Sequence, residues 1–298
     1  MIGYLYSIPC LAREIGIAPP PMTHNGKHRP FSVKLYMPDG NPDGLKLIEK
    51  SNWTGVGLVI PRPLYSDARK RPELQRTGIY LLIGPQDDLQ LSQVYVGEGD
   101  PTGPRLDQHA KNKDFWTHVV AFTNKDQSLN KAHVQFLESK LIELAHRAKR
   151  CVLENGNTPQ CPSLTEADMA EADGFLADVL LCLPVLGYGF FETPSSQAKT
   201  TSEYMIESKG VMARGYETAT EFVVKQGSHV VKEETASIHS HLNKLRQTLV
   251  AQGVLVDRGS YGFSSPSTAA GVVLGRSANG RAEWKTRDGR TLKEVQGG

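Results

Sequence analysis

The amino-acid sequence predicts an α+β protein, and three stretches in the first half of the chain carry this prediction. Two short apolar strands, Ile79–Ile83 and Val94–Val96, flank a polar loop around Asp87, which is a β-hairpin signal. The β-branched and aromatic residues of Phe115–Phe122 predict a third strand beside this hairpin. From Lys131 onward, apolar residues recur at helical spacing and predict an amphipathic helix. Its buried stripe is expected to contain Val134, Leu137, Leu141, Leu144 and Ala145.

Further strands and helices are expected on both sides of this segment. Residues 31–37 alternate apolar and polar side chains, and residues 45–48 and 55–60 form short apolar runs. The N-terminal part is therefore expected to be rich in β-strands. After the amphipathic helix, Ser163 and Glu166 have the spacing of a capping box, which predicts the start of another helix.

The C-terminal part is predicted to be a small α+β module. Short strands are expected between residues 204 and 224, followed by a helix at about 235–252. Ser265-Pro266 is typical of a helix start, and Asn279-Gly280 is typical of a hairpin turn. The polar residues 194–202 that precede this module are expected to be a linker.

The length of the chain, 298 residues, exceeds that of a typical single domain, so several domains are expected. The predicted parts are an N-terminal β-rich region at 1–74, a central domain at 75–195 and the C-terminal module at 200–298. The first thirty residues contain Pro19-Pro20-Pro21 and the polar stretch HNGKHRP, which predict a flexible or surface-wrapped lead-in.

The composition is that of a globular protein with a core. Hydrophobic residues make up 39% of the chain and charged residues 22%. The formal net charge of +2 neither requires nor excludes a nucleic-acid partner, so a basic surface would have to be local. The four cysteines are scattered and form no Cys-x-x-Cys pair. They are expected to be reduced thiols rather than metal ligands.

The N-terminal residues do not have the pattern of a secretory signal. Their apolar run has no lysine or arginine ahead of it and is interrupted by Pro9. No apolar run in the sequence reaches the length that a membrane span needs. We therefore expect a cytoplasmic protein with no membrane partner.

Four motifs follow one another in the central part of the chain. Gly78-Ile79-Tyr80 is followed by Tyr95-Val96-Gly97, then by Arg105 with His109 four residues later, and then by Glu138 inside the apolar helix. In this order they resemble the GIY-YIG nuclease superfamily, although either triplet alone is common in strands. The resemblance implies that the central domain is a small mixed or antiparallel three-stranded sheet flanked by helices. It also implies a metal-dependent DNA endonuclease that uses Mg²⁺ or Mn²⁺ to hydrolyse phosphodiester bonds.

The resemblance also implies catalytic roles for individual side chains. Tyr80 is expected to be the general base or to position the attacking water, with Tyr95 as a partner that helps to orient it. A phenol with an ordinary pKa of about 10 is a poor base at neutral pH, unless a hydrogen bond or a cation stabilises its phenolate. Arg105 offers a planar fork for a phosphate oxygen. His109 is expected to assist proton movement at the water or to hold Tyr80 in place.

Glu138 lies on the buried stripe of its predicted helix. A carboxylate in such a place costs free energy unless its charge is compensated, because buried charges are normally paired or bound to a metal. A divalent cation is one compensation, and a salt bridge to a lysine or arginine is the other. The resemblance favours the cation, so Glu138 is expected to hold a single Mg²⁺ that acts as a Lewis acid.

Substrate contacts are expected close to these catalytic side chains. Lys111 and Lys113 come next along the chain and are candidates for phosphate contact, and Gly97 belongs to the second triplet. Members of the family commonly place an asparagine near the active site, and either Asn155 or Asn157 matches that residue. Asn-Gly is also a turn signal in its own right, so turn formation is an alternative for both.

The tail from Phe263 to Trp284 resembles a small C-terminal module of undefined function that accompanies restriction, modification and GIY-YIG proteins. Between Gly271 and Gly298 there are six lysines and arginines against three acids. This excess is consistent with contacts to a nucleic-acid backbone, and a solvated hairpin explains it equally well. The module favours a role linked to restriction or phage defence.

Two alternatives to a DNA endonuclease stay open from the sequence. One is a catalytically inactive protein that binds nucleic acid or assembles complexes on a nuclease scaffold. The other is a nuclease that acts on RNA, because its chemistry would be the same. Cutting both strands of a duplex with one site needs two protomers or two turnovers, so a homodimer is a further expectation.

Overall fold

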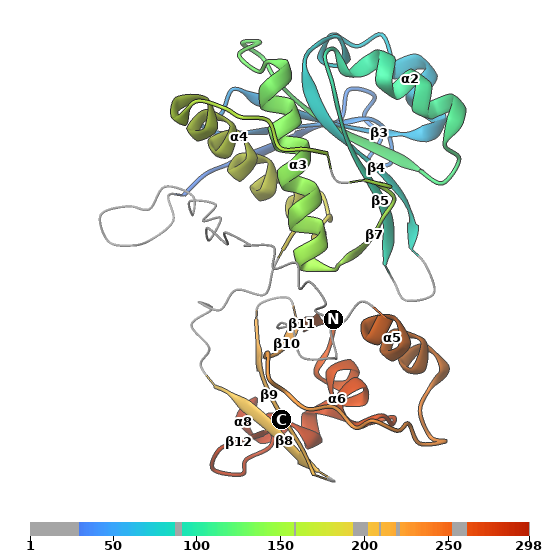
Figure 1. Ribbon diagram of the computed structural model, residues 1–298, viewed down its shortest axis with the longest axis vertical. Coiled ribbons are helices and arrows are strands. Elements are labelled where there is room, and N and C mark those ends of the chain that lie inside the picture. The colour runs from blue at the N-terminus through green and yellow to red at the C-terminus, as the bar shows by residue number, and fades with distance from the viewer. Residues whose placement is uncertain are drawn as a thin grey trace, which may run out of the picture. The chain divides into compact units, whose positions relative to one another are not determined.

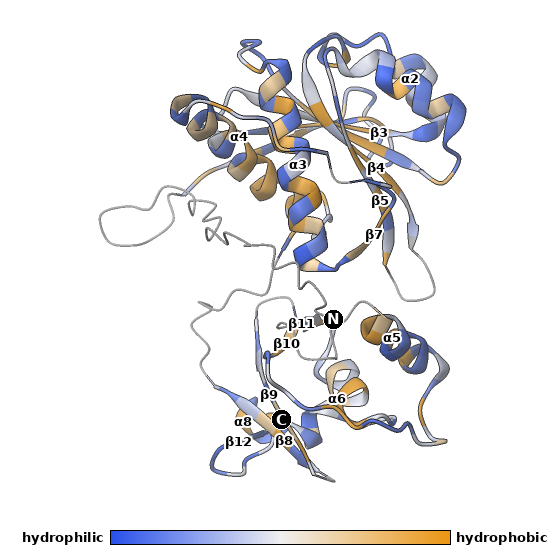
Figure 2. Ribbon diagram, viewed as in Figure 1, coloured by the Kyte–Doolittle hydropathy of each residue, from blue (hydrophilic) through white to orange (hydrophobic). Residues whose placement is uncertain are grey.

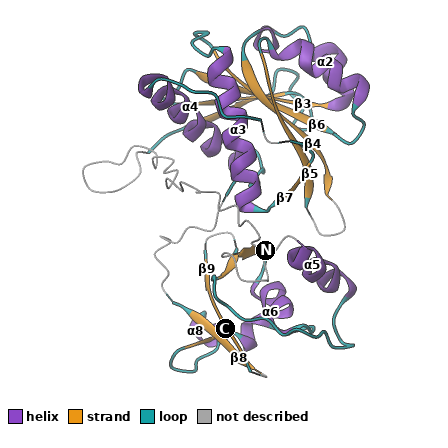
Figure 3. Cartoon of the chain, viewed as in Figure 1, coloured by secondary structure: helices purple, strands orange, loops and turns teal. Residues whose placement is uncertain are grey.

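The computed structural model describes residues 30–86, 91–157, 159–192, 202–208, 210–218, 221–251 and 261–297. The expected lead-in, the hairpin loop around Asp87, most of the expected linker and the last residue of the helix predicted at 235–252 lie outside these residues. The fold is α+β, as predicted, with one mixed and one antiparallel sheet (Figures 1 and 3). The chain forms two compact units. The first takes in residues up to 83, 95–141 and 155–189, and the second takes in 84–94, 142–154 and 190–298.

A seven-stranded sheet contains the predicted hairpin. Its strand order is β1-β2-β3-β6-β4-β5-β7. The strands are β1 (Val33–Tyr36), β2 (Lys46–Lys50), β3 (Gly55–Pro61), β4 (Gly78–Gln86), β5 (Ser92–Gly99), β6 (His118–Asn124) and β7 (Cys151–Leu153). The two hairpin strands, β4 and β5, lie next to each other, and β6 pairs antiparallel with β4. The three strands expected from the sequence are therefore neighbours.

The sheet is larger than the three strands expected for the central domain, because the N-terminal strands extend it on one side and β7 pairs parallel with β5 on the other. β3 pairs antiparallel with β6 over seven residues, from Gly55 opposite Asn124 to Pro61 opposite His118. This pairing occupies backbone groups of β6 that would otherwise form an open sheet edge. Six of the seven residues of β3 are buried. The division of the chain at residues 74 and 195 stays a prediction.

Helices lie on both sides of this sheet, and their bounds are α1 (Tyr65–Ala68), α2 (Thr102–Asn112), α3 (Lys131–Ala148) and α4 (Glu166–Val185). The predicted stripe of α3 is confirmed, since all five of its residues are buried. Figure 2 shows apolar residues along β3, β4 and α4, whereas much of α2 is hydrophilic. The capping box predicted at Ser163 is wrong, because the N-cap of α4 is Thr165, two residues later, whose hydroxyl accepts from the backbone N–H of Asp168.

The second sheet is antiparallel, with the strand order β11-β10-β9-β8-β12. Its strands are β8 (Tyr204–Ser208), β9 (Val211–Glu217), β10 (Phe222–Val224), β11 (Tyr261–Phe263) and β12 (Lys285–Thr286). The helices of this module are α5 (Ser240–Ala251), α6 (Pro266–Leu274), α7 (Gly280–Glu283) and α8 (Leu292–Val295). Its core is built around Phe222 and Trp284, whose ring centroids are 4.6 Å apart, and around α6.

The predicted hairpin turn at Asn279-Gly280 is wrong. Asn279 is instead the N-cap of α7, and its side chain accepts a hydrogen bond from the backbone N–H of Arg281. Gly280 is required by packing rather than by a turn, because a Cβ atom there would collide with the backbone of Pro266. The predicted helix start at Ser265-Pro266 is confirmed, with Ser265 as N-cap.

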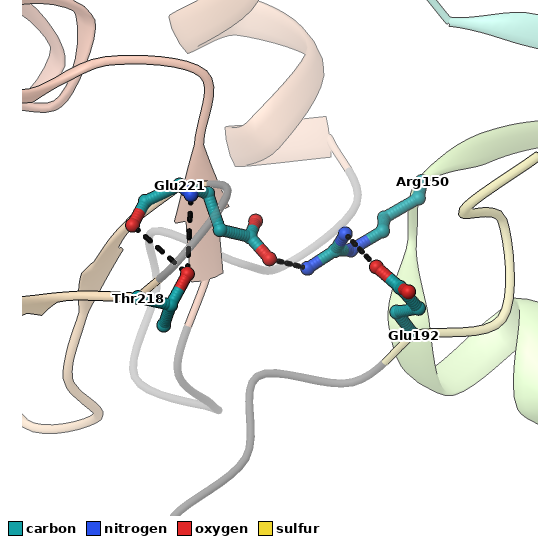
Figure 4. A network of polar contacts seen from close by, with 4 residues as sticks. All are labelled: Arg150, Glu192, Thr218 and Glu221. Carbon is teal, nitrogen blue, oxygen red and sulfur yellow. Dashed lines mark hydrogen bonds and ion pairs between the residues drawn. The ribbon is translucent and has the colours of Figure 1, made fainter. Parts of the chain in front are cut away.

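Arg150 forms a polar network within the second unit (Figure 4). Its guanidinium pairs with Glu192 at 3.4 Å and with Glu221. The backbone N–H of Glu221 donates to the Thr218 hydroxyl at 3.1 Å, and that hydroxyl donates back to the Glu221 carbonyl. The hydroxyl thus holds the residue that carries the carboxylate. Among the helices that the structure describes, none has the length and apolar character to cross a bilayer.

Candidate functional site

Four elements bring the predicted catalytic side chains together, and all five residues belong to the first unit. Tyr80 lies on β4, Tyr95 on β5, Arg105 and His109 on α2, and Glu138 on α3. The Tyr80 hydroxyl lies 2.9 Å from Nε2 of His109. The ring of His109 also packs against Tyr95, with centroids 4.9 Å apart, and the two tyrosine rings are 6.5 Å apart. Charges on Arg105 and Glu138 are close enough to shift the pKa of both tyrosines.

The local structure explains this convergence. Tyr80 and Tyr95 lie on neighbouring strands of the sheet. Arg105 and His109 are one helical turn apart on α2, so their side chains share a face. Gly97 is buried and lies against the ring of Tyr80. A Cβ atom at this position would lie only 2.5 Å from the Tyr80 hydroxyl oxygen, so a larger residue would collide with it.

The two phenols are protonated in this environment. Burial is the main cause that raises the pKa of Tyr80, which has no exposed surface, and the charge of Arg105 opposes the rise. Burial also raises the pKa of the half-buried Tyr95, and the carboxylate of Glu138 raises it further. Neither tyrosine is therefore a phenolate at neutral pH.

His109 is neutral at the same pH. Burial, with the positive charges of Lys113 and Arg105, lowers its pKa to about 4. A neutral imidazole has one nitrogen free to accept a proton. Nε2 of His109 can therefore accept the hydrogen bond of the Tyr80 hydroxyl, with the ring proton on Nδ1.

Glu138 has the most unusual carboxylate of the site. Burial and the neighbouring charge of Glu98 raise its pKa to about 7, while Arg105 and Lys131 oppose the rise. A carboxylate that is half protonated at neutral pH lacks full compensation of its charge. Whether a divalent cation supplies the remaining compensation stays a prediction.

Glu98 was missed by the sequence analysis. It follows Tyr95-Val96-Gly97 directly on β5, is buried, and accepts from the Lys131 ammonium through both carboxylate oxygens, at 2.6 and 2.7 Å. The available signals were an acid next to the second triplet and a lysine seven residues before Glu138 on the same helix. The sequence alone does not predict that these two residues form a pair, because 33 positions separate them.

The two predicted phosphate contacts differ in position. The ammonium of Lys113 lies 4.5 Å from the centroid of the Tyr95 ring, which is a cation–π contact at the site. Its backbone N–H also donates to the carbonyl of His109 at the end of α2. Lys111 is exposed on α2. Their roles in substrate binding stay predictions.

The structure separates the two candidate asparagines. The Asn155 side chain accepts from the Val96 backbone N–H at 2.9 Å and donates to the Val96 carbonyl at 2.8 Å. It is therefore fastened to the middle residue of the second triplet. Asn157 is exposed in a bend. Asn155 holds β5 by the same pattern of hydrogen bonds that another strand would use.

The donor set limits what metal the site can take. Within the described ranges, no three histidine, cysteine or acidic side chains gather as a metal-binding group. Glu138 offers one carboxylate, because both oxygens of the nearby Glu98 accept from Lys131. Mg²⁺ often uses one or two carboxylates together with waters and substrate phosphates. The residues fit that kind of site better than a fully protein-ligated one.

Comparison with known proteins concerns the C-terminal module. A family model described as "Domain of unknown function (DUF4357)" matches residues 204–296, which include all five strands of the second sheet. This match supports the expected C-terminal module of undefined function. No curated protein and no solved structure matches the chain.

Proposed function

We propose that this protein is a metal-dependent endonuclease that hydrolyses phosphodiester bonds in DNA, with Tyr80, Tyr95, Arg105, His109 and Glu138 as its catalytic residues. The convergence of four separate elements on one place supports this proposal most directly. Its central contact is the hydrogen bond between Tyr80 and His109. The ordered motifs that resemble the GIY-YIG superfamily add support from the sequence.

The first task of the site is to take a proton from the attacking water. In our proposal the Tyr80 oxygen accepts that proton while its own proton passes to Nε2 of His109. One O–H bond of water breaks, a new phenol O–H bond forms, and the former phenol proton becomes an N–H of the imidazole. The 2.9 Å contact and the neutral state of His109 are what this transfer requires. Tyr95, packed against His109, keeps the imidazole in place.

The second task is to bind the phosphate. Arg105 is exposed, and its charge acts on Tyr80, Tyr95 and Glu138. Its planar guanidinium can donate to two phosphate oxygens at once. The negative charge of a bound phosphate would also offset the cations that lower the pKa of His109, so substrate binding favours proton uptake by the imidazole.

Glu138 would hold the divalent cation, Mg²⁺ or Mn²⁺. A cation would offset the negative charge that burial makes unfavourable at Glu138. When bound, such a cation supplies Lewis acidity that stabilises the leaving 3′-oxygen. The C-terminal module gives this proposal its biological direction, which is restriction or phage defence.

A second candidate function is a non-cleaving protein that binds nucleic acid or assembles complexes. The buried Tyr80 hydroxyl favours it, because in the free protein this group has no exposed surface from which water can reach it. A nuclease that acts on RNA would use the same residues. These candidates differ in what the protein does to a nucleic acid after binding it.

Plasmid cleavage distinguishes the candidates. Supercoiled plasmid is incubated with the protein and Mg²⁺ or Mn²⁺, beside the Glu138→Ala and Tyr80→Phe variants, with Glu143→Ala as a control on the same helix. We expect the parent and Glu143→Ala to nick or linearise the plasmid. We expect Glu138→Ala and EDTA to abolish cleavage, while the variants still shift the DNA in a gel.

Three outcomes would contradict the proposal. Equal cleavage by the parent and Glu138→Ala would remove Glu138 from the catalytic site. Binding of DNA without cleavage under either metal would favour the non-cleaving protein. A single-stranded RNA cleaved in preference to DNA would identify the substrate as RNA.

A further inference from the structure

Glu98 and Lys131 form an ion pair of unequal burial beside the proposed catalytic site. Both Glu98 oxygens accept from the Lys131 ammonium, at 2.6 and 2.7 Å. The Glu98 side chain is only 11% exposed, whereas that of Lys131 is 51% exposed. The carboxylate is thus fixed inside the protein, while the lysine reaches solvent.

Both partners of the ion pair lie near Glu138. Glu98 is the next residue after the second motif triplet on β5. Lys131 and Glu138 are seven residues apart on α3, which is close to two helical turns and places them on one face. The charges of Glu98 and Lys131 both act on the Glu138 carboxyl group. The ion pair therefore lies close enough to Glu138 to affect the pKa of its carboxyl group, as Arg105 also does.

The geometry leaves the ammonium able to bind something else. An ammonium has three N–H donors, and the two oxygens of Glu98 account for two of them. With half of its side chain exposed, Lys131 can offer the third to a ligand in solvent. Stability alone is a weak explanation for this pair, since burying one carboxylate costs free energy that a half-exposed lysine offsets only in part.

We propose that Lys131 is a phosphate contact of this site, and that Glu98 is the positioning residue that holds its ammonium there. The inference rests on the proposed function for the identity of the ligand, which is a phosphate of a nucleic acid. It does not require cleavage, because a non-cleaving binding protein would use the same contact. Lys131 would act beside Arg105, and the two cations would approach the phosphate from different helices.

The test measures DNA binding and cleavage with the full chain. Variants are Lys131→Gln, Lys131→Arg, Glu98→Gln and the double variant Glu98→Gln/Lys131→Gln. Lys125→Gln is a matched control, because Lys125 pairs with Glu49 at 2.9 Å on another part of the sheet. Binding of a fluorescent DNA duplex is followed by anisotropy in EDTA over a series of salt concentrations. Cleavage of the same duplex is then measured under single turnover with Mg²⁺, and thermal unfolding checks that each variant is folded.

We expect Lys131→Gln to reduce the slope of log affinity against log salt by about 1, as the loss of one phosphate contact predicts. We expect its cleavage rate constant to fall by about 10-fold or more, because a cation near the developing charge is lost. Lys131→Arg should retain most of the salt slope and of the cleavage rate constant, and Lys125→Gln should match the parent in both quantities. The double variant should be no weaker than Lys131→Gln, because Glu98 acts through Lys131.

Three results decide the matter. If Lys131→Gln has the salt slope and the cleavage rate of the parent, the inference is wrong, and a lower unfolding temperature of this variant would show that the pair is only structural. If the slope falls while even the parent cleaves nothing, the phosphate contact stands and the nuclease proposal fails. If Glu98→Gln weakens the Lys131→Gln variant further, the positioning role of Glu98 is wrong.

Discussion

A Cβ atom on Gly97 would stand 2.5 Å from the hydroxyl oxygen of Tyr80. The two motif triplets are therefore in direct contact, since Gly97, the last residue of the second triplet, leaves room for Tyr80, the last residue of the first. The ring of Tyr80 can reach His109 because the facing position on β5 has no side chain. The glycine therefore helps to set the geometry of the candidate site, although it contributes no functional group.

Adding a methyl group at Gly97 should displace Tyr80. We expect Gly97→Ala to destabilise the fold by about 1–3 kcal/mol, as overpacking of a filled core does, and to abolish plasmid cleavage. Urea unfolding and the nicking assay measure the two effects. Gly174→Ala on α4 is the control, because a Cβ atom there meets nothing within 4 Å. Full cleavage by folded Gly97→Ala would show that the position of Tyr80 is not critical.

Tyr80 and His109 should behave as one functional unit. If the phenol proton passes to His109, removing either partner breaks the same transfer. Tyr80→Phe, His109→Ala and the double variant should then show similar single-turnover rate constants, rather than the product of two separate losses. Tyr95→Phe should be less damaging, since it keeps the ring that packs on His109. Multiplicative losses in the double variant would argue for separate roles.

The raised pKa of Glu138 makes stability depend on pH in a defined direction. In the folded protein its pKa is about 7, above the usual value of 4.5, so between these values the folded state binds more protons than the unfolded state. The free energy of unfolding contributed by this group therefore decreases as pH rises from about 4.5 to about 7. Urea unfolding without divalent cation should show this decrease for the parent and less of it for Glu138→Gln.

The same carboxyl group should control metal uptake. A divalent cation needs the deprotonated form, so affinity for Mn²⁺ should fall below pH about 7, by up to about tenfold per pH unit. Isothermal titration calorimetry in buffers of different ionisation enthalpy would detect the proton released on binding. An affinity that does not change between mildly acidic and mildly basic pH would mean that the cation binds elsewhere.

The two asparagines should differ sharply when truncated. Asn155→Ala leaves the N–H and the carbonyl of Val96 without their partners, which should cost about 1–3 kcal/mol of stability and slow cleavage by loosening β5. Asn157→Ala should change stability by less than about 0.5 kcal/mol, because the residue is exposed. Thermal unfolding and nicking of both variants provide the comparison. Equal effects would mean that the Asn155 side chain is not needed to hold β5.

Local patterns were enough to predict the elements on which the site is built. The hairpin strands, the strand at β6 and the buried stripe of α3 follow from spacing along a single segment, since periodicity reports which side of an element is buried. The four ordered motifs were visible for the same reason. Each is a short run whose residue types can be read without knowing what lies across from it.

Contacts between distant segments could not be predicted in this way. The pairing of β3 with β6, which enlarges the sheet, depends on which of several apolar strands meet. The choice between Asn155 and Asn157 depends on the free backbone groups of Val96. Asn279 caps α7 instead of forming a hairpin turn, and Gly280 is needed because the backbone of Pro266 leaves no room for a Cβ atom there.

The sequence by itself therefore determined the fold class, the order of the motifs and the identity of five candidate catalytic residues. Only the tertiary structure decided that Tyr80 lies within hydrogen-bond distance of His109 and that Gly97 makes room for the Tyr80 ring. It also decided that the buried Glu98 holds Lys131 near Glu138. The physical reason is that propensity and periodicity act between near neighbours in the chain. The burial and electrostatics of the site depend instead on groups that only folding brings within a few ångströms of one another.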